Sequence, residues 1–261
     1  MKIHVNAVSH SGNIREKNED RIYVSKCETE TDPSEYKIDR LFADTGNYSF
    51  AVFDGMGGLA FGDKAAVIAR QCLIDADNSM DRIDIKKCIS DMNNAVVSLK
   101  RSERQRTGST LVWLNIYDDE FILANIGDSR GYLYRNGSLK QQSEDHTEAE
   151  MLRRINEDTS NSLQDKLIIS EKSEHVLTQH LGIENSDFMI EPYICKGQLE
   201  DADVFLLCSD GLTDMLSDNV IETILSDNDY SLKDKCDRLL EIALKKGGRD
   251  NISIILVKIE L

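Results

Sequence analysis

The sequence predicts an α+β fold with antiparallel sheets, and two observations support this prediction. Several strand-like runs follow one another across tight turns, which join antiparallel neighbours. Two long helix-like runs come together in the chain instead of alternating with strands, as they would in a doubly wound parallel sheet. The order of the strands within each sheet does not follow from these patterns.

Strand patterns dominate the N-terminal part of the chain. Ile3–Ala7 alternates apolar and polar residues, and Ile22–Val24 repeats the alternation. Tyr48–Phe53 is a third strand-like run. The polar segment Glu28–Gly46 interrupts these strands, and we interpret it as a flexible loop.

Helical periodicity begins after the third strand. Gly62–Asn78 and Ile83–Arg104 carry apolar residues at helical spacing among many good helix formers. The last part of the chain mixes both kinds of element. We predict helices at Thr147–Asn156, Val220–Leu225 and Leu232–Lys245, and strands at Phe188–Cys195, Val204–Cys208 and Ile252–Ile259.

Two hairpins are predicted between these helical regions. Asp118-Asp119 separates the strand-like runs Ser109–Tyr117 and Glu120–Ile126. Asn136-Gly137, a dipeptide that two-residue hairpin turns prefer, separates Gly131–Arg135 from Ser138–Gln142. Hairpins require antiparallel pairing, which is the basis of the predicted fold class.

The bulk composition restricts the function. The chain has 261 residues and a formal net charge of −16, so nucleic acids and anionic membrane surfaces are not expected partners. Its six cysteines form no C-x-x-C pair, which favours reduced thiols over a disulfide framework. We see no linker, repeat, signal core or bilayer-length apolar stretch, and we predict one cytoplasmic domain over residues 1–261.

Several aspartates stand where an apolar strand meets a glycine. A carboxylate at a strand end is held rigidly, and a neighbouring glycine lets another group approach the backbone. Asn18-Glu19-Asp20 adds two carboxylates just before a strand. The other segments are Asp54-Gly55, Gly127-Asp128, Asp210-Gly211 and Gly248-Arg249-Asp250.

Gathered carboxylates indicate divalent cations, because they cannot all stay ionised in a cleft without them. Oxygen ligands suit Mg²⁺ or Mn²⁺, and the histidines show no zinc-type spacing. A site with two such ions typically activates a bridging water for in-line attack on phosphorus. Each motif taken singly also fits an ordinary turn or solvated loop.

The residues do not fit two other kinds of hydrolase, a serine esterase and a cysteine phosphatase. A serine esterase using Ser129 would need a histidine base, usually beside an aspartate late in the chain, whereas the last histidine is His180. A cysteine phosphatase would need a phosphate-cradling loop ending in arginine, and nothing of that kind follows Cys208. We interpret Cys208 as a core residue.

The motifs, in this order, resemble the metal-dependent Ser/Thr protein phosphatases, the PPM or type-2C family, and the Asp-Gly-Met-Gly-Gly form is similar to its bacterial branch. The resemblance covers essentially the whole chain. Its blocks are Arg15-Glu16-Lys17-Asn18-Glu19-Asp20, Asp54-Gly55-Met56-Gly57-Gly58, Thr107-Gly108-Ser109-Thr110, Gly127-Asp128-Ser129-Arg130, Asp145-His146-Thr147, Leu177-Thr178-Gln179, Ser209-Asp210-Gly211-Leu212 and Arg249-Asp250-Asn251.

The resemblance implies a role for each site residue. The Gly55 carbonyl would be a further metal ligand, Glu19 would hold a metal water, and Asp128 would bind a weaker third ion together with Asp210. Arg15 would grip the substrate phosphate with its planar guanidinium. The aspartates implied to hold the two central ions are Asp20, Asp54, Asp210 and Asp250. Arg15, Asp54 and Asp210 are the residues expected to be catalytic.

The resemblance also implies a four-layer αββα sandwich, two packed antiparallel sheets flanked by helices, with the metals at one edge. The implied activity is hydrolysis of phosphoserine and phosphothreonine in proteins by a water that bridges Mn²⁺ or Mg²⁺ ions. Expected partners are phosphorylated proteins, such as a Ser/Thr kinase, its substrates or an anti-sigma-type protein. The alternative is a catalytically silent binding module with this fold, for which loss of the metal-ligand aspartates would be typical; all are present.

Three positions depart from the family pattern. Met56 stands where eukaryotic members often carry a histidine suggested as general acid, so we hypothesise that a metal-bound water protonates the leaving oxygen. Gln179 stands where bacterial relatives commonly have arginine. The mobile flap is implied at residues 144–176, with unusually polar residues over Glu144–Glu174. Substrate preference therefore does not transfer from the family.

Overall fold

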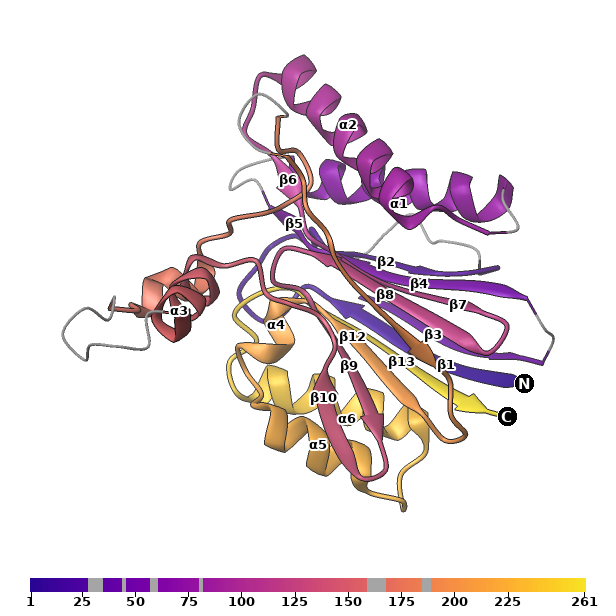
Figure 1. Ribbon diagram of the computed structural model, residues 1–261. Coiled ribbons are helices and arrows are strands. Elements are labelled where there is room, and N and C mark those ends of the chain that lie inside the picture. The colour runs from indigo at the N-terminus through magenta and orange to yellow at the C-terminus, as the bar shows by residue number, and fades with distance from the viewer. Residues whose placement is uncertain (28–34, 44–45, 57–60, 80–81, 159–167, 185–188) are drawn as a thin grey trace.

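Two large antiparallel sheets form the centre of the molecule (Figure 1). The computed structural model describes residues 1–261 except for 28–34, 44–45, 57–60, 80–81, 159–167 and 185–188. The first sheet has the strand order β10-β9-β12-β13-β1-β3, with every neighbouring pair antiparallel. Its strands are β1 (Lys2–His10), β3 (Glu35–Phe42), β9 (Arg130–Arg135), β10 (Ser138–Gln141), β12 (Val204–Cys208) and β13 (Ile252–Glu260).

The second sheet has the order β11-β8-β7-β4-β2 and is also antiparallel throughout. A short third sheet pairs β5 with β6. The strands of the second sheet are β2 (Arg21–Val24), β4 (Asn47–Phe53), β7 (Leu111–Tyr117), β8 (Glu120–Ile126) and β11 (Tyr193–Gln198), and those of the third are β5 (Gly55–Met56) and β6 (Gly108–Ser109).

Helices cover the outer face of each large sheet. In Figure 1, α1 (Gly62–Ser79) and α2 (Ile85–Glu103) lie over the second sheet, whereas α4 (Asp210–Thr213), α5 (Asp218–Ser226) and α6 (Leu232–Lys245) lie over the first. The helix α3 (Glu148–Asp158) and the 3₁₀ helix η1 (Glu171–His175) project away from both sheets. The order of layers is helix, sheet, sheet, helix, which confirms the predicted four-layer α+β sandwich.

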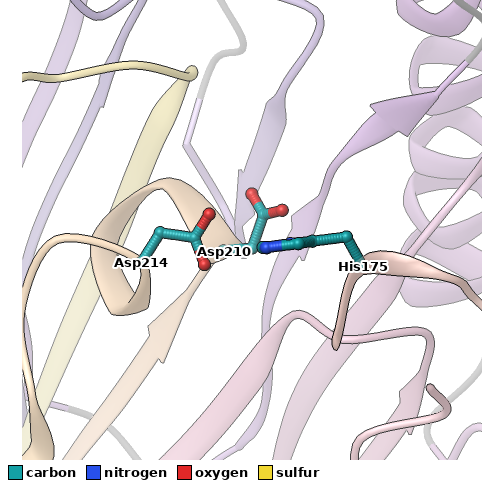
Figure 2. Close-up of side chains that lie close together, drawn as sticks. All are labelled: His175, Asp210 and Asp214. Atoms are coloured by element: carbon teal, nitrogen blue, oxygen red, sulfur yellow. The ribbon is translucent and has the colours of Figure 1, made fainter. Parts of the chain in front are cut away.

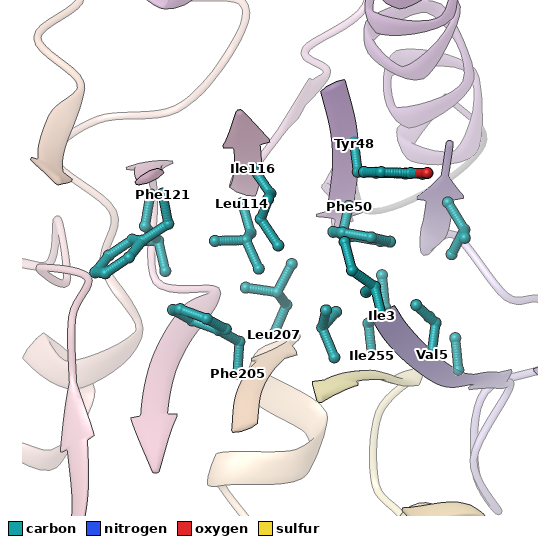
Figure 3. Close-up of a cluster of buried hydrophobic side chains, with 14 of the residues drawn as sticks. Ile3, Val5, Tyr48, Phe50, Leu114, Ile116, Phe121, Phe205, Leu207 and Ile255 are labelled. Atoms are coloured by element: carbon teal, nitrogen blue, oxygen red, sulfur yellow. The ribbon is translucent and has the colours of Figure 1, made fainter. Parts of the chain in front are cut away.

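The alternation of side chains along the strands explains why the layers stack. On β13, Ile255 and Val257 face the second sheet, while Ile254 and Leu256 face the α4–α6 layer. Figure 3 shows the core between the sheets, where β1, β12 and β13 meet β4, β7 and β8. Its labelled side chains are Ile3, Val5, Tyr48, Phe50, Leu114, Ile116, Phe121, Phe205, Leu207 and Ile255.

Most predicted elements are confirmed, and the predicted Asn136-Gly137 hairpin is among them. Both turn residues have positive φ, 53° and 80°, as the two-residue type I′ turn requires. All six cysteines are free, which agrees with the predicted reduced thiols. Among the described helices, none combines the length and apolar character needed to cross a bilayer.

The prediction of a flexible loop over Glu28–Gly46 is wrong for its central part. β3 runs from Glu35 to Phe42 and pairs with β1 at the edge of the first sheet. Ile38 is buried in the core between the sheets, and Tyr36 and Phe42 pack against that core while partly exposed. The exposed Arg40 interrupts their alternation, so the sequence pattern of the strand is incomplete. The rest of the predicted loop includes residues 28–34 and 44–45, which lie outside the described residues.

Several predicted strands have different boundaries in the structure, and two of these differences have a physical reason. The strand predicted at Phe188–Cys195 begins at Tyr193 instead, because Pro192 has no N–H to donate to the β8 ladder. The strand predicted at Ser109–Tyr117 is divided at Thr110 into β6 and β7. The Thr110 amide donates to the Asp54 carbonyl at 2.8 Å, so this residue joins the site loops rather than a sheet.

Candidate active site

A cavity of about 440 Å³ brings most of the predicted site residues together. It contains carboxylates from five separated parts of the chain and one exposed guanidinium. Asp20 is the one predicted ligand that is not among the lining residues. The cavity is lined by Arg15, Glu19, Asp54, Gly55, Met56, Thr110, Asp128, His175, Leu177, His180, Asp210, Asp250 and Asn251.

Strand ends position the carboxylates, as the sequence predicted. Asp54 directly follows β4, and Asp210 opens α4 two residues after the end of β12. Asp128 lies between β8 and β9, and Asp250 lies two residues before β13. Because β4 and β8 belong to one sheet and β12 and β13 to the other, the site depends on the stacking of both sheets.

The loop between β1 and β2 is fastened to the start of β13 by Asn251. The side-chain amide of Asn251 donates to the carbonyl oxygens of Ser11 and Lys17, each at 2.9 Å. Its side-chain oxygen accepts the backbone N–H of Glu19 at 2.8 Å. These bonds hold the segment that carries Arg15 and Glu19 at the cavity.

Arg15 pairs with Asp250 at the cavity wall. Its Nη2 atom donates to Asp250 Oδ2 at 2.6 Å, and the two side chains are 55% and 35% exposed. The hydrogen bond to Asp250 is the main cause that raises the pKa of Arg15. The guanidinium therefore stays charged beside the carboxylates and keeps access to solvent.

Asp20 is buried, with 1% of its surface exposed. Its Oδ2 atom accepts the hydroxyl hydrogen of Ser209 at 2.8 Å, while its Oδ1 atom has no hydrogen-bond partner. Burial raises the pKa of Asp20 to about 6, although hydrogen bonds from Ser253 and Ser209 act in the opposite direction. The charged form of Asp20 is therefore poorly supported by the protein alone.

Asp54 and Asp210 are the most strongly perturbed carboxyls of the cavity. Burial raises the pKa of each well above its ordinary value, and repulsion from neighbouring carboxylates raises it further. For Asp54 the first of these neighbours is Asp20, and for Asp210 it is Asp128. Asp210 Oδ1 is buried without a hydrogen-bond partner.

Asp128 and Glu19 are perturbed in the same direction. Burial raises the pKa of Asp128 to about 6, and burial is also the main cause that raises the pKa of Glu19. A hydrogen bond from its own backbone amide lowers the pKa of Asp128, and the charge of Arg15 lowers the pKa of Glu19, but burial has the larger effect on both.

Bound divalent cations fit this cavity. The unpartnered, buried Oδ1 atoms of Asp20 and Asp210 are the kind of atom that a cation would satisfy. The positive charge would also stabilise carboxylates whose pKa is raised by burial and mutual repulsion. Among the predicted ligands all donors are oxygens, which suits Mg²⁺ and Mn²⁺.

Sequence reasoning missed two residues of the site, His175 and Asp214. Their ligand atoms and one of Asp210 all lie within 4.8 Å of one another, and Figure 2 shows the three side chains close together. Asp214 is four residues after Asp210, one helical turn, which is a spacing that sequence could have indicated. His175 comes from η1 and carries no such pattern, since only packing brings it to Asp210.

The alternative nucleophiles do not face the cavity. Ser129 is fully buried, and its hydroxyl bonds to the Thr110 hydroxyl at 2.6 Å instead of to a histidine. Burial raises the pKa of the Cys208 thiol to about 12, so this thiol is an inert part of the core. Both residues are structural, which confirms the prediction that Cys208 is a core residue.

Two of the departures can also be placed. Met56 lines the cavity. Gln179 does not: its side-chain amide donates to the Met189 carbonyl at 3.3 Å, and its oxygen accepts the Glu191 amide at 3.3 Å. Of the predicted flap, the structure describes α3 and η1, whereas residues 159–167 lie outside the described residues.

Comparison with known proteins gives consistent results. The family model "Protein phosphatase 2C" matches residues 25–252. The chain is 33% identical over 220 residues to the serine/threonine phosphatase stp of Listeria welshimeri, covering 79% of this chain and 82% of the relative. It is 29% identical over 262 residues to the serine/threonine protein phosphatase PstP of Mycobacterium tuberculosis, covering 97% of this chain and 44% of the relative.

Solved structures show the same architecture. The serine/threonine phosphatase PstP/Ppp of M. tuberculosis superposes with a TM-score of 0.75 at 27% identity, over 100% of both chains. The serine/threonine phosphatase of S. agalactiae gives a TM-score of 0.77 at 26% identity, over 99% of this chain and 100% of the other. A PstP catalytic domain solved with two manganese ions gives a TM-score of 0.75 at 26% identity, covering 99% of this chain and 100% of that chain.

The fold, the carboxylate cavity and these relatives together define a phosphoprotein phosphatase. The chain belongs to the protein phosphatase 2C family, the metal-dependent PPM-type Ser/Thr phosphatases, and its curated relatives are bacterial.

Proposed function

We propose that the chain hydrolyses phosphoserine and phosphothreonine in proteins with two Mn²⁺ or Mg²⁺ ions held in the cavity. Their ligands would be the carboxylates of Asp20, Asp54, Asp210 and Asp250 and the carbonyl oxygen of Gly55. When bound, two such ions supply the positive charge that makes a water reactive enough to attack phosphorus in line. Support for two ions comes from the PstP domain solved with two manganese ions.

One observation carries this proposal. Asp20 and Asp210 each bury an Oδ1 atom that no hydrogen-bond donor of the described chain reaches. An unpartnered buried carboxylate oxygen is costly, and such atoms persist where a ligand satisfies them. Two of them at one edge of the sandwich, beside two more carboxylates, are what a dinuclear site requires.

The remaining residues receive the roles that their positions support. Arg15 is exposed enough to bind the substrate phosphate with the guanidinium face that Asp250 leaves free. Glu19 would hold a metal water, and Asp128 would bind a weaker third ion shared with Asp210. Asp214 and His175 offer further ligand atoms beside Asp210.

The substrates, the location and the domain organisation of the chain are also part of the proposal. The substrates we propose are a bacterial Ser/Thr kinase and the proteins that it phosphorylates, in the cytoplasm. We also propose that residues 1–261 act as one catalytic domain, in which residues 144–176 form a flap subdomain. The helices α3 and η1 project away from the sheets (Figure 1), and Thr147, just before α3, forms a β-bridge with the cavity residue Leu177. Both observations support such a flap.

The test is metal-dependent turnover. The purified chain is stripped of metal, and hydrolysis of a phosphothreonine peptide is followed with and without Mn²⁺. We expect turnover with Mn²⁺. In Asp210→Asn, kcat should fall at least about 100-fold, which is the effect of removing one group that stabilises the charge of a transition state. Asp229→Asn, an exposed aspartate between α5 and α6, is the control and should behave as the parent.

Two outcomes would contradict the proposal. Full turnover in Asp210→Asn would remove the dinuclear site from the mechanism. A folded parent that shows no turnover with any divalent ion would favour the binding-module alternative.

A further inference from the structure

His180 lies in the cavity without a role in the proposed hydrolysis. It lines the same space as Arg15, Asp54 and Met56, and it belongs to none of the carboxylate motifs. Its position is fixed by the backbone that follows it. The Leu181 amide donates to the Ser109 carbonyl at 2.8 Å, and the Ser109 amide donates to the Leu181 carbonyl at 3.2 Å.

This pairing connects His180 to the centre of the site. Ser109 is paired with Gly55 in the β5–β6 sheet, so the His180 backbone is held through one intervening strand to a proposed metal ligand. On the other side, Asn93 Oδ1 accepts the Gly182 amide at 2.8 Å, which anchors the segment to α2. The imidazole is therefore carried by a rigid support.

Gly108 provides the space for the imidazole ring. A Cβ atom at this position would come within 2.7 Å of His180 Nδ1. Gly108 is also the residue paired with Met56 in the β5–β6 sheet. The ring thus packs on the backbone opposite Met56, at the wall of the cavity that Met56 lines.

The hydrogen bonds of His180 define which of its nitrogens is available. Nδ1 lies 2.9 Å from the Leu181 carbonyl oxygen, which can only accept, so Nδ1 carries a hydrogen. Burial is the main cause that lowers the pKa of His180. The hydrogen bond to the Leu181 carbonyl raises the pKa, and the charge of Lys100 lowers it. The ring is neutral near pH 7, and its Nε2 atom presents an unshared electron pair, an acceptor.

A phosphate monoester offers no partner to this acceptor at neutral pH, since its oxygens are themselves acceptors and are mostly ionised. A phosphorylated polypeptide offers its backbone N–H groups. We propose that His180 Nε2 accepts a hydrogen bond from a substrate backbone N–H next to the phosphorylated residue. His180 is then a specificity-determining residue that distinguishes phosphoproteins from small phosphate esters, an inference that rests on the proposed function.

Two substitutions separate the nitrogens of the ring. His180→Asn keeps a donor near the Nδ1 position and removes the Nε2 acceptor, whereas His180→Gln places an acceptor near the Nε2 position. His4→Gln, near the start of β1 with its Nε2 atom 3.2 Å from a carboxylate oxygen of Glu260, is the matched control. Each variant is assayed with Mn²⁺ on a phosphothreonine peptide and on p-nitrophenyl phosphate, which has no N–H group, after its melting temperature confirms that it is folded.

We expect His180→Asn to raise KM for the peptide about 5-fold, the worth of one hydrogen bond, with kcat unchanged. Turnover of p-nitrophenyl phosphate should stay within about 2-fold of the parent, since this ester makes no such bond. His180→Gln should recover part of the peptide affinity. A series of peptides, each N-methylated at a single backbone amide, locates the donor. For one peptide of the series, KM should rise about 5-fold with the parent enzyme and should not rise further with His180→Asn.

Other results would overturn the proposal. An unchanged peptide KM in His180→Asn would show that Nε2 is not used, and an equal loss on both substrates would show a role in holding the site together. A fall in kcat that grows with the basicity of the leaving group would make His180 a proton donor instead. If the parent enzyme hydrolyses neither the phosphothreonine peptide nor p-nitrophenyl phosphate, the proposed function itself is wrong.

Discussion

Asp54 and Asp210 lie where the protein alone disfavours their charged forms, because burial and neighbouring carboxylates both raise their pKa. Without metal, these residues therefore cost stability. Asparagine, an amide of the same shape as aspartate, would remove the repulsion but would also remove the proposed metal ligand. Residues at which function and stability conflict in this way are typical of active sites.

The stability effect gives a prediction for Asp54→Asn. In the metal-free protein we expect the free energy of unfolding at pH 7 to rise by roughly 1 kcal/mol, which for a chain of this size raises Tm by about 2–4 °C. Added Mn²⁺ should stabilise the parent and have little effect on the variant. Thermal unfolding of both proteins in chelator and in Mn²⁺ measures this. A lower Tm for the metal-free variant would mean that the carboxylate has a protein partner after all.

Some site residues could be predicted from sequence, and others could not. Asp54, Asp128 and Asp210 stand at strand ends beside glycines, a local pattern that sequence displays directly. His175 and His180 reach the cavity only because of how distant segments pack, which no local pattern records. The burial of Asp20 next to Ser209 likewise depends on a contact across the fold.

At the scale of elements, the connection between the β1–β2 loop and β13 depends on one side chain. Asn251 makes the bonds to Ser11, Lys17 and Glu19 described above, and it lies at the entrance to the last strand. Without it, the loop would keep the bonds of Asn13 to Leu244 and Gly247 but would lose its anchor near Arg15. We therefore expect the loop to position Arg15, the proposed phosphate-binding residue, only while Asn251 is in place.

We expect Asn251→Ala to lower the free energy of unfolding by about 1–3 kcal/mol, since three part-buried backbone groups lose their hydrogen bonds. Peptide turnover should fall as well, because Arg15 and Glu19 lose their support. Urea denaturation and the Mn²⁺-dependent assay measure the two effects. The control is Asn94→Ala on the exposed face of α2, for which both should stay close to the parent. An Asn251→Ala protein with parental turnover would show that the loop is held by other contacts.

The elements that sequence predicted best are those buried on both faces or capped clearly. β12 was predicted with its observed boundaries, since all its residues are buried, and so was α6, which begins with a capping box between Ser231 and Asp234. β3 and part of β11 were missed because they are edge strands with exposed polar side chains. Edge strands are specified by their partner strand, which a local pattern does not contain.

For the whole molecule, the raised carboxyl pKa values determine how stability depends on pH. Asp20 and Asp128 have a pKa of about 6 in the folded protein, above the value of about 3.9 for an unfolded aspartate. The folded state therefore binds more protons between these values. The stability that this contributes is fully present below about pH 4 and is lost as the pH rises through 6.

We therefore expect the Tm of the metal-free protein to fall between pH 5 and pH 7, by a few °C given about 1.4 kcal/mol for each pKa unit. Saturating Mn²⁺ should weaken or reverse the trend, since metal binding requires deprotonated ligands. Replacing Asp20 and Asp128 together by asparagine should make the metal-free profile shallower, while Asp54 and Asp210, whose pKa is also raised, still contribute. Because the net charge of −16 also acts over this range, an unchanged slope in the double variant would assign the effect to these remaining carboxyls and to general repulsion.

The pairing of β1 with β13 has a consequence for biosynthesis. Lys2 lies opposite Glu260 and His10 opposite Ile252, so β1 leaves the ribosome well before its partner strand and stays unpaired on this side until β13 is made. Asp250 and Asn251 emerge just ahead of β13. A chain in which β13 has not yet been made can neither complete the first sheet nor assemble the carboxylate cavity. Phosphatase activity should thus begin only after β13 has cleared the exit tunnel.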